Sequence, residues 1–367
     1  DRPIIVIGGM QATMSPEVFR AMADYVFIGD GDDHLGEILD ALERGERPHS
    51  QYLISAETEN VPHPAECEPS PFRMSKGGKR DVTRIEIARG CVCRCSFCAL
   101  SNLKPYREVS YADVVPLLDG VKGMVSMFAP ERTMHREWPQ IRAEIQRRGL
   151  RDLGQDARLE RLLEVQGKSV TCGLEGISER LRASIGKRFT DDFIIDKFQA
   201  FVERAKGVAM ISAYFIADLP GEDLEDWEAI WALFEKIERK KFSRMMTFKP
   251  VLNPLSPKQF TDLADALIHP FRDYEARWLS LLRMNQSQWG FRLVETLVWG
   301  PWERMLDVVV NRGGERAYNV VRKIPLKLIE NKPVKAEREA YARKLVQVCA
   351  ESGLTNELLG IDCAKEF

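Results

Sequence analysis

Residues 90–98 read Gly90-Cys91-Val92-Cys93-Arg94-Cys95-Ser96-Phe97-Cys98 and contain four of the chain's eight cysteines. Disulfides in secreted proteins join distant loops, so their cysteines are spread along the chain. A tight cluster in a chain of 367 residues instead predicts metal ligation in a reducing compartment. The start, Asp1-Arg2-Pro3-Ile4, lacks the basic and apolar segments of a signal peptide. We therefore predict a cytoplasmic protein.

The spacing C-x3-C-x2-C selects Cys91, Cys95 and Cys98 as a three-thiolate metal site. Three thiolates can hold one cubane iron–sulfur cluster, each on a separate iron, and leave the fourth iron open to a ligand. The alternative is a structural zinc site built from all four cysteines, although zinc sites usually pair C-x2-C elements across a longer gap. Cys93 is expected to point away as a spare thiol.

Strands and helices alternate on both sides of this cluster. From residue 82, strands are predicted at 83–88, 123–128, 150–153, 169–173, 209–217 and 244–249, and helices at 111–118, 138–148, 157–165, 191–205 and 224–240. Five or six βα repeats predict an α/β fold, a partial (β/α)6 TIM-like barrel with its site at the C-terminal ends of the strands.

Three further segments flank this core, which we assign to residues 81–255. Residues 1–47 show a βαβα pattern, which predicts a truncated Rossmann-like unit. Two βα units cannot cover both faces of a sheet, so we expect either that they pack on the next domain or that earlier strands precede them. Residues 48–80 are rich in proline and predict a linker. Residues 256–367 predict a mainly helical C-terminal domain containing four tryptophans, Trp278, Trp289, Trp299 and Trp302.

Charge is distributed unevenly, although the net charge is only −2. Residues 1–70 contain fourteen acidic and four basic side chains, so the rest of the chain is basic. Residues 73–107 hold nine Lys or Arg against two acids, and residues 236–249 hold six more. Such a basic rim would suit a phosphate-bearing partner, such as nucleic acid. Scattered solvated charge together with cofactor contacts is the alternative and explains the same residues equally well. No apolar run is long enough to cross a membrane, so no membrane partner is predicted.

The cysteine motif, with Phe97 before its last cysteine and a strand before the loop, resembles the radical S-adenosylmethionine (radical SAM) superfamily. Residues 170–182 and 185–187, which include Gly173-Leu174-Glu175-Gly176, resemble the fourth-strand motif of its cobalamin-associated and methylthiotransferase-like branches. Residues 214–222 resemble the fifth-strand motif, and Phe248-Lys249-Pro250 the end of the sixth strand. The glycines near residues 8 and 30 resemble the last units of a cobalamin-binding-type Rossmann domain.

This resemblance implies a [4Fe-4S] cluster on Cys91, Cys95 and Cys98 that binds S-adenosylmethionine (SAM) at its open iron. It implies reductive cleavage of SAM and hydrogen abstraction from a substrate, with electrons from a donor such as flavodoxin or ferredoxin. The residues expected near the cofactor on this basis are Phe97, Glu131, Glu175, Arg182, Lys187, Asp218, Leu219 and Lys249. Lys187 or Arg182 would pair with the cofactor carboxylate, and Asp218 and Leu219 would offer main-chain groups to adenine.

Cobalamin is predicted to be absent, because Asp32-Asp33-His34-Leu35-Gly36 is one residue shorter than the family's Asp-x-His-x-x-Gly motif and lies in the wrong unit. His34 is therefore interpreted as a surface residue at a helix start. The basic residues favour modification of a nucleic-acid base or its appended group. A peptide or small-metabolite substrate is the alternative within enzymes, and a non-catalytic metal-binding protein is the alternative outside them.

Overall fold

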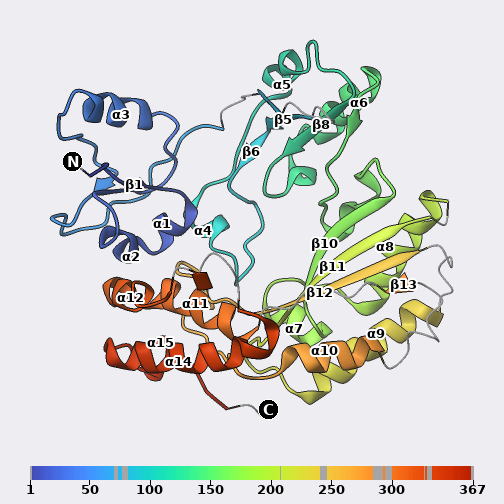
Figure 1. The fold of residues 1–367 in the computed structure, drawn as a ribbon. Coiled ribbons are helices and arrows are strands. Elements are labelled where there is room, and N and C mark those ends of the chain that lie inside the picture. Colours follow the sequence, from blue (N-terminus) through green and yellow to red (C-terminus); the bar gives the residue numbers. More distant parts are fainter. Residues whose placement is uncertain are drawn as a thin grey trace.

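The computed structural model describes residues 2–69, 73–76, 82–206, 208–239, 246–283, 292–293, 300–325, 327–328 and 333–364. These residues form an N-terminal unit, a central α/β core and a C-terminal set of helices (Figure 1). In Figure 1 the N-terminal unit is blue, the core runs from cyan to yellow and the C-terminal helices are orange to red.

The N-terminal unit is a small three-stranded sheet with order β1-β2-β3. Its elements are β1 (Val6–Ile7), α1 (Met10–Met14), α2 (Pro16–Arg20), β2 (Tyr25–Phe27), α3 (Leu35–Glu43) and β3 (Leu53–Ile54). The first two strands are parallel, as the βαβα pattern predicts, and β3 runs antiparallel to β2. Val18 of α2 is buried in the same apolar cluster as the C-terminal helices, so this unit does pack on another part of the protein.

The core contains two four-stranded sheets, ordered β4-β5-β8-β9 and β10-β11-β12-β13. Their strands are β4 (Arg73–Lys76), β5 (Val82–Glu86), β8 (Met124–Phe128), β9 (Arg151–Asp152), β10 (Ser169–Gly176), β11 (Met210–Ala217), β12 (Thr247–Pro254) and β13 (Arg292–Leu293). All neighbours are parallel except β4 and β5. A parallel bridge between Asp156 and Thr171 links the end of the first sheet to β10.

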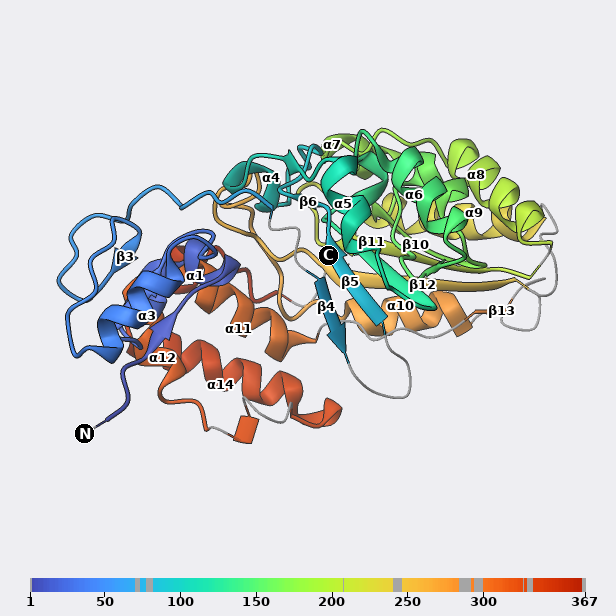
Figure 2. The ribbon, with the colours of Figure 1, turned by 90° about the horizontal axis from the view of Figure 1, so that it is seen from above.

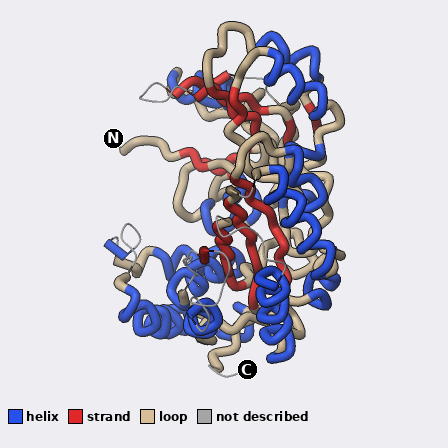
Figure 3. Tube along the Cα trace, turned by 90° about the vertical axis from the view of Figure 1, so that its right-hand side faces the viewer, coloured by secondary structure: helices blue, strands red, loops and turns tan. Residues whose placement is uncertain are grey.

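The helices of the core lie mostly on one side of these sheets (Figures 2 and 3). They are α4 (Leu100–Leu103), α5 (Tyr111–Leu117), α6 (Trp138–Arg147), α7 (Glu179–Ser184), α8 (Asp191–Arg204) and α9 (Leu224–Arg239), with 3-10 helices η1 (Arg132–Met134) and η2 (Leu159–Glu164). The main apolar core packs α8 and α9 against β10, β11 and β12 through Phe198, Phe215, Phe234 and Phe248. This packing leaves the C-terminal ends of the strands free to build a site.

The C-terminal part is helical, as predicted. It consists of α10 (Tyr274–Arg283), α11 (Pro301–Arg312), α12 (Gly314–Val321), η3 (Lys335–Glu337), α14 (Arg338–Glu351) and α15 (Asn356–Leu359). Trp278 and Trp302 are buried in apolar clusters, while Trp289 and Trp299 lie outside the described residues. No helix in the described part of the chain is both long and apolar enough to cross a membrane.

Two details differ from the sequence-based expectations. The segment predicted as a linker, residues 48–80, contributes β3 to the N-terminal sheet and β4 to the first core sheet. The helix predicted over 157–165 is the 3-10 helix η2. The five prolines of this segment all lie outside Leu53–Ile54 and Arg73–Lys76, so they do not prevent these two short edge strands from pairing.

Candidate active site

A cavity of about 610 Å³ opens at the C-terminal ends of β10, β11 and β12. All four clustered cysteines line it, together with Phe97, Glu131, Glu175 and Lys187 among the predicted cofactor residues. Its volume lies in the usual range for small-molecule sites, ~300–1,000 Å³. The structure thus brings the cysteine loop and four of the predicted cofactor residues to one place.

The cysteine loop leaves the core between two short strands, β6 (Ala88–Arg89) and β7 (Arg107–Glu108), which pair antiparallel. Gly90 has a φ of 69°, and a Cβ there would lie 2.2 Å from the carbonyl oxygen of Pro105. Only glycine fits this backbone and this close approach. The glycine before the first cysteine therefore lets both ends of the loop meet.

The four clustered cysteines give this cavity a thiolate donor set. A cubane takes one thiolate on each of three irons. Thiolates are also the usual ligands of iron–sulfur clusters. The arrangement of these cysteines around one cavity therefore fits a cubane.

Cys93 does not point away, contrary to the prediction. It lines the cavity, and its sulfur accepts a hydrogen bond of 2.7 Å from Nη1 of Arg158. A hydrogen bond from Cys91, and then the charge of Arg158, lower the pKa of Cys93 to about 6. Arg158 is held in turn by Glu160. Sequence reasoning missed Arg158 because it lies sixty-five residues beyond Cys93.

Glu175 reaches the cavity because of the glycines around it. The register between β10 and β11 shifts between Gly173 and Glu175, and Glu175 has a φ of 71°. A Cβ at Gly173 would lie 2.0 Å from Oε1 of Glu175, and one at Gly176 would lie 2.4 Å from the amide of Arg182. The Gly-x-Glu-Gly motif therefore bends the carboxylate over the strand and lets α7 pack directly behind it.

The carboxylate of Glu175 has a single cation near it among its described contacts, Lys187, whose Nζ lies 3.9 Å away. Burial raises the pKa of Glu175, and the charge of Lys187 opposes this shift. Lys187 also approaches the carbonyl of Gly173 at 3.5 Å. A half-buried acid with so distant a partner can accept hydrogen bonds from a ligand in the cavity.

Glu131 also lines the cavity and directly precedes η1. Its Oε1 accepts hydrogen bonds from the amide of Thr133, at 3.1 Å, and from the hydroxyl of the same residue. These bonds orient the side chain, and Glu131 lines the cavity. Phe97 lines it as well and packs against the main core, so it fits both a cofactor contact and an ordinary core aromatic.

Arg182 is not available to a cofactor carboxylate, contrary to the prediction. Its side chain is fully buried and pairs with Asp191 at 2.5 Å. Nε also donates to the carbonyl of Phe189 at 3.1 Å. Burial lowers the pKa of Arg182. This arginine holds the loop between α7 and α8, so we do not retain it as a cofactor residue.

Asp218 and Leu219 also lie away from the cavity, contrary to the prediction. The carboxylate of Asp218 accepts hydrogen bonds from the His269 amide and Nδ1, from the Tyr274 hydroxyl and from Arg304. The amide of Leu219 donates to Glu222 at 3.3 Å. This polar cluster attaches the end of β11 to the C-terminal helices, which explains the buried charges without a ligand.

Lys249 does not line the cavity either. It lies on β12, four residues before Asn253, which does line the cavity. Four residues of a strand span ~13 Å. The cavity wall instead includes Tyr214, Asn253, Ser256 and Lys258, none of which the sequence predicted. The strand alternation in β11 and β12 was the one signal that could have indicated Tyr214 and Asn253.

His34 lies directly before α3, where a helix-start histidine was predicted. Its ring is half buried and packs against Tyr52, with a centroid distance of 4.9 Å, and against Phe27 at 5.9 Å. Asp32, the first residue of the shortened motif that ends at Gly36, pairs with Arg89 of the core. In this conformation both residues make contacts within the protein. These contacts do not test cobalamin binding, so the absence of cobalamin stays a prediction.

Part of the chain, including the cysteine loop, matches a known protein family. The family model described as the radical SAM superfamily matches residues 85–234, which run from the end of β5 through the cysteine loop into α9. The match covers 150 of the chain's 367 residues, so this part of the chain is similar to the radical SAM superfamily. This family consists of enzymes that use SAM, and it implies a [4Fe-4S] cluster.

Two curated relatives match parts of the chain. An uncharacterized protein of Methanocaldococcus jannaschii is 29% identical over 189 residues, which are 48% of this chain and 41% of that protein. The bacteriochlorophyllide d C-8(2)-methyltransferase of Chlorobaculum tepidum is 30% identical over 112 residues, which are 28% of this chain and 24% of the relative. The chain thus spans less than half the length of these relatives.

Two solved structures are similar at low identity. One is the cobalamin-dependent SAM radical enzyme OxsB with aqua-cobalamin and SAM bound, at 14% identity and a TM-score of 0.46, covering 95% of this chain and 59% of OxsB. The other is SuiB of Streptococcus suis, at 13% identity and a TM-score of 0.38, covering 58% of this chain and 47% of SuiB. These distant similarities carry no argument about cofactor or substrate.

Proposed function

We propose that this protein binds a [4Fe-4S] cluster through Cys91, Cys95 and Cys98, cleaves SAM reductively and starts hydrogen abstraction from a substrate. The observation that supports this most is one cavity lined by all three cysteines and by Phe97, Glu131, Glu175 and Lys187. When bound, the cluster would supply the single electron that breaks a carbon–sulfur bond of SAM. A donor such as flavodoxin or ferredoxin would deliver that electron.

The protein's own residues would bind and orient SAM. Glu175 and Glu131 are two of the acceptors that line the cavity, and they suit the hydroxyl and amino groups of the cofactor. Two residues were predicted as partners of the cofactor carboxylate, Lys187 and Arg182. Because Arg182 is buried and paired with Asp191, Lys187 is the one that remains available. Phe97 would pack beside the adenine and exclude water.

We propose further that the two core sheets together form the expected partial (β/α)6 barrel. The parallel bridge from Asp156 to Thr171 supports this, because Asp156 follows β9, the last strand of one sheet, and pairs with β10, the first strand of the other. The cavity lies at the C-terminal strand ends, where barrel enzymes hold their sites. We keep the division between core and C-terminal domain near residue 255, directly after β12.

For the substrate we favour a small metabolite or peptide over nucleic acid. Three of the basic residues counted toward a phosphate-binding rim, Arg89, Lys104 and Arg107, form ion pairs with acids of the protein itself. Their charge is therefore compensated within the chain. The predicted run at 236–249 lies partly outside the described residues, and Lys236 approaches Asp191 at 3.5 Å.

Anaerobic reconstitution with iron and sulfide tests the proposed function. We expect about four irons per chain, and 5′-deoxyadenosine after addition of SAM and a reductant. One zinc per chain and no 5′-deoxyadenosine would support the non-catalytic metal-binding alternative instead. Deuterium transfer from labelled candidate metabolites and peptides into 5′-deoxyadenosine would then identify the substrate. Salt-dependent DNA or RNA binding would argue for nucleic acid after all.

A further inference from the structure

The cysteine loop, residues 90–106, is closed by two short strands that place two positive charges opposite each other. In the antiparallel pair of β6 and β7, Arg89 lies directly opposite Arg107. Like charges in opposite positions of two strands destabilise the pair. Lys104 adds a third positive charge near the same end of the loop. The loop therefore needs negative charge from elsewhere to keep its two ends together.

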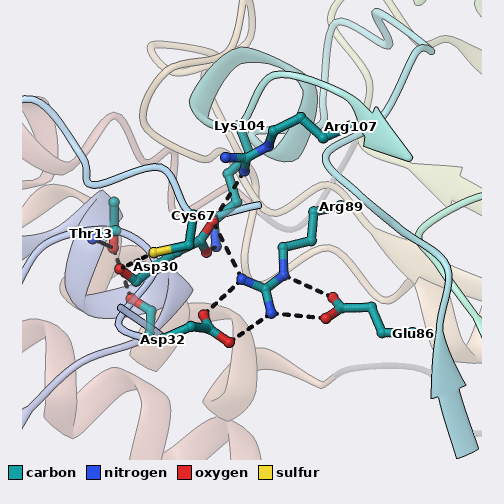
Figure 4. Close-up of polar contacts among 10 residues, drawn as sticks. Thr13, Asp30, Asp32, Cys67, Glu86, Arg89, Lys104 and Arg107 are labelled. Carbon is teal, nitrogen blue, oxygen red and sulfur yellow. Dashed lines mark hydrogen bonds and ion pairs between the residues drawn. The ribbon is translucent and has the colours of Figure 1, made fainter. Parts of the chain in front are cut away.

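That charge comes from the N-terminal unit. The carboxylate of Asp30, which follows β2, accepts a hydrogen bond from Arg107 at 3.1 Å and another from Lys104, and it lies 3.8 Å from Arg89 (Figure 4). Its side chain is only 5% exposed. One buried carboxylate thus contacts cations from both ends of the cysteine loop, fifty-nine to seventy-seven residues away in sequence.

Two further acids complete the network around Arg89. Asp32 accepts two hydrogen bonds from its guanidinium, at 2.6 and 2.8 Å, and Glu86 accepts two others at 2.9 and 2.8 Å. Figure 4 shows the guanidinium between these two carboxylates. Arg89 is therefore fixed without Asp30, whereas the contacts of Lys104 and Arg107 in this network depend on it.

The backbone around Asp30 is itself held rigidly. Its amide donates to the carbonyl of Ala65 at 2.9 Å, and the Cys67 thiol donates to its carbonyl at 3.4 Å. Gly29 has a φ of 105°, and a Cβ there would lie 2.2 Å from the Ala65 amide. The hydroxyl of Thr13 accepts from the Gly29 amide at 2.9 Å. Asp30 is thus a fixed anchor and not a mobile surface acid.

We propose that Asp30 is a positioning residue for the cluster: the N-terminal unit holds the two ends of the cysteine loop through this carboxylate and so sets the conformation in which the loop binds iron. This inference rests on the proposed function. The contact also pairs the acidic N-terminal segment with the basic core, because the charge of each compensates the charge of the other there. Asp30 touches neither the cluster nor SAM, so its effect would act through the loop.

The test uses three single variants and one double variant of the full chain. Asp30→Asn removes the anchor charge, and Lys104→Gln removes one of its partners while Arg89 and Arg107 remain. Asp24→Asn is the matched control, because Asp24 pairs with Arg2 on the same unit at 2.6 Å and has no described contact with the loop. All are reconstituted anaerobically, and iron release to a chelator and the electron paramagnetic resonance spectrum of the reduced, SAM-bound cluster are recorded.

We expect Asp30→Asn and Lys104→Gln each to release iron about tenfold faster than the wild type and to broaden the spectrum, because a buried charge pair has been broken. The double variant should be little worse than either single one, since both remove the same interaction. Asp24→Asn should match the wild type in both measurements.

Iron release and spectra that stay at wild-type values in Asp30→Asn and Lys104→Gln would overturn the inference, even if both variants melt at a lower temperature. Should Asp30→Asn fail to fold, Lys104→Gln alone tests the inference, because Asp30 keeps its contacts with Arg89 and Arg107 in that variant. Failure of the wild type to take up iron would instead overturn the proposed function, and this inference with it.

Discussion

Two neighbouring strands carry carboxylates at their C-terminal ends, Glu175 half-buried and Asp218 buried, which look alike in sequence and differ in surroundings. Glu175 ends β10 with a φ of 71°, and Asp218 follows β11 with a φ of 62°. Non-glycine residues seldom adopt this left-handed backbone, and it is often associated with functional sites. Glu175 faces the cavity with only a loosely placed lysine, whereas Asp218 is saturated by donors from three residues.

The pKa shifts of the two acids differ in direction for the same reason. Burial raises the pKa of Glu175, since Lys187 compensates little. Burial acts on Asp218 as well, but the hydrogen bonds from His269 and the charge of Arg304 outweigh it and lower its pKa. Backbone strain and burial alone therefore do not identify a ligand-binding acid. The feature that makes Glu175 the better candidate is that its carboxylate has few hydrogen-bond donors near it and faces a cavity.

The largest expected effect is on stability, in Asp218→Asn. This change removes the charge that compensates Arg304, whose side chain is 2% exposed. Removal of one partner of a buried ion pair costs ~3–5 kcal/mol. We expect the free energy of unfolding of the apo-protein to fall by about that amount in urea denaturation, with Asp262→Asn, at an exposed position, as the control. An unchanged unfolding midpoint would mean that the cluster at the end of β11 is not structural.

The next effect is on ligand binding, in Glu175→Gln. Loss of a charged acceptor should weaken SAM binding to the reconstituted, unreduced protein about tenfold, which corresponds to ~1.4 kcal/mol. The unfolding free energy should change little, because a neutral side chain is easier to bury. Equilibrium dialysis with Glu203→Gln, an exposed acid of α8, as control measures the difference. Wild-type affinity in Glu175→Gln would remove Glu175 from the proposed site.

A smaller effect should appear as a pH dependence at Glu222, which contacts the same cluster as Asp218. Burial, and then the charge of Asp218, raise the pKa of Glu222 to about 8. A raised folded-state pKa gives stability that is complete below the unfolded value, ~4.3, and is lost as the pH rises through about 8. Asp218, whose pKa is lowered, has the opposite sign and loses its contribution in acid.

Glu222→Gln should therefore be relatively more stable than the wild type at pH 9 than at pH 6, by about 1 kcal/mol or more. Thermal unfolding of the apo-protein at the two pH values measures this difference. An equal offset at both pH values would show that Glu222 titrates normally and that the cluster around Asp218 does not hold it protonated.

The sequence was sufficient for the elements that follow local patterns. The strands now numbered β8, β10 and β11, the helices α5, α6, α8 and α9, and the loop with Cys91, Cys95 and Cys98 all fall within a few residues of their predicted places. Hydrophobic periodicity and the spacing of cysteines are short-range signals, which a single sequence contains. The family assignment followed from the same signals.

The contacts that decide roles are long-range, and the sequence could not supply them. His269, Tyr274 and Arg304 lie fifty-one to eighty-six residues beyond Asp218, so a structural acid was predicted as a cofactor contact. Lys104 and Asp30 are separated by seventy-four residues, so paired charges were counted as a rim for nucleic acid. Charge counts cannot distinguish internal ion pairs from a binding surface.

The most direct test of the proposed cluster compares serine variants of the four cysteines in one cavity. After anaerobic reconstitution, Cys93→Ser should retain about four irons per chain and form 5′-deoxyadenosine, because the proposed ligand set leaves Cys93 out. Cys91→Ser, Cys95→Ser and Cys98→Ser should each lose the stable cluster and the product. Loss of iron in Cys93→Ser to the same extent, or a single zinc ion held by all four cysteines, would contradict the account.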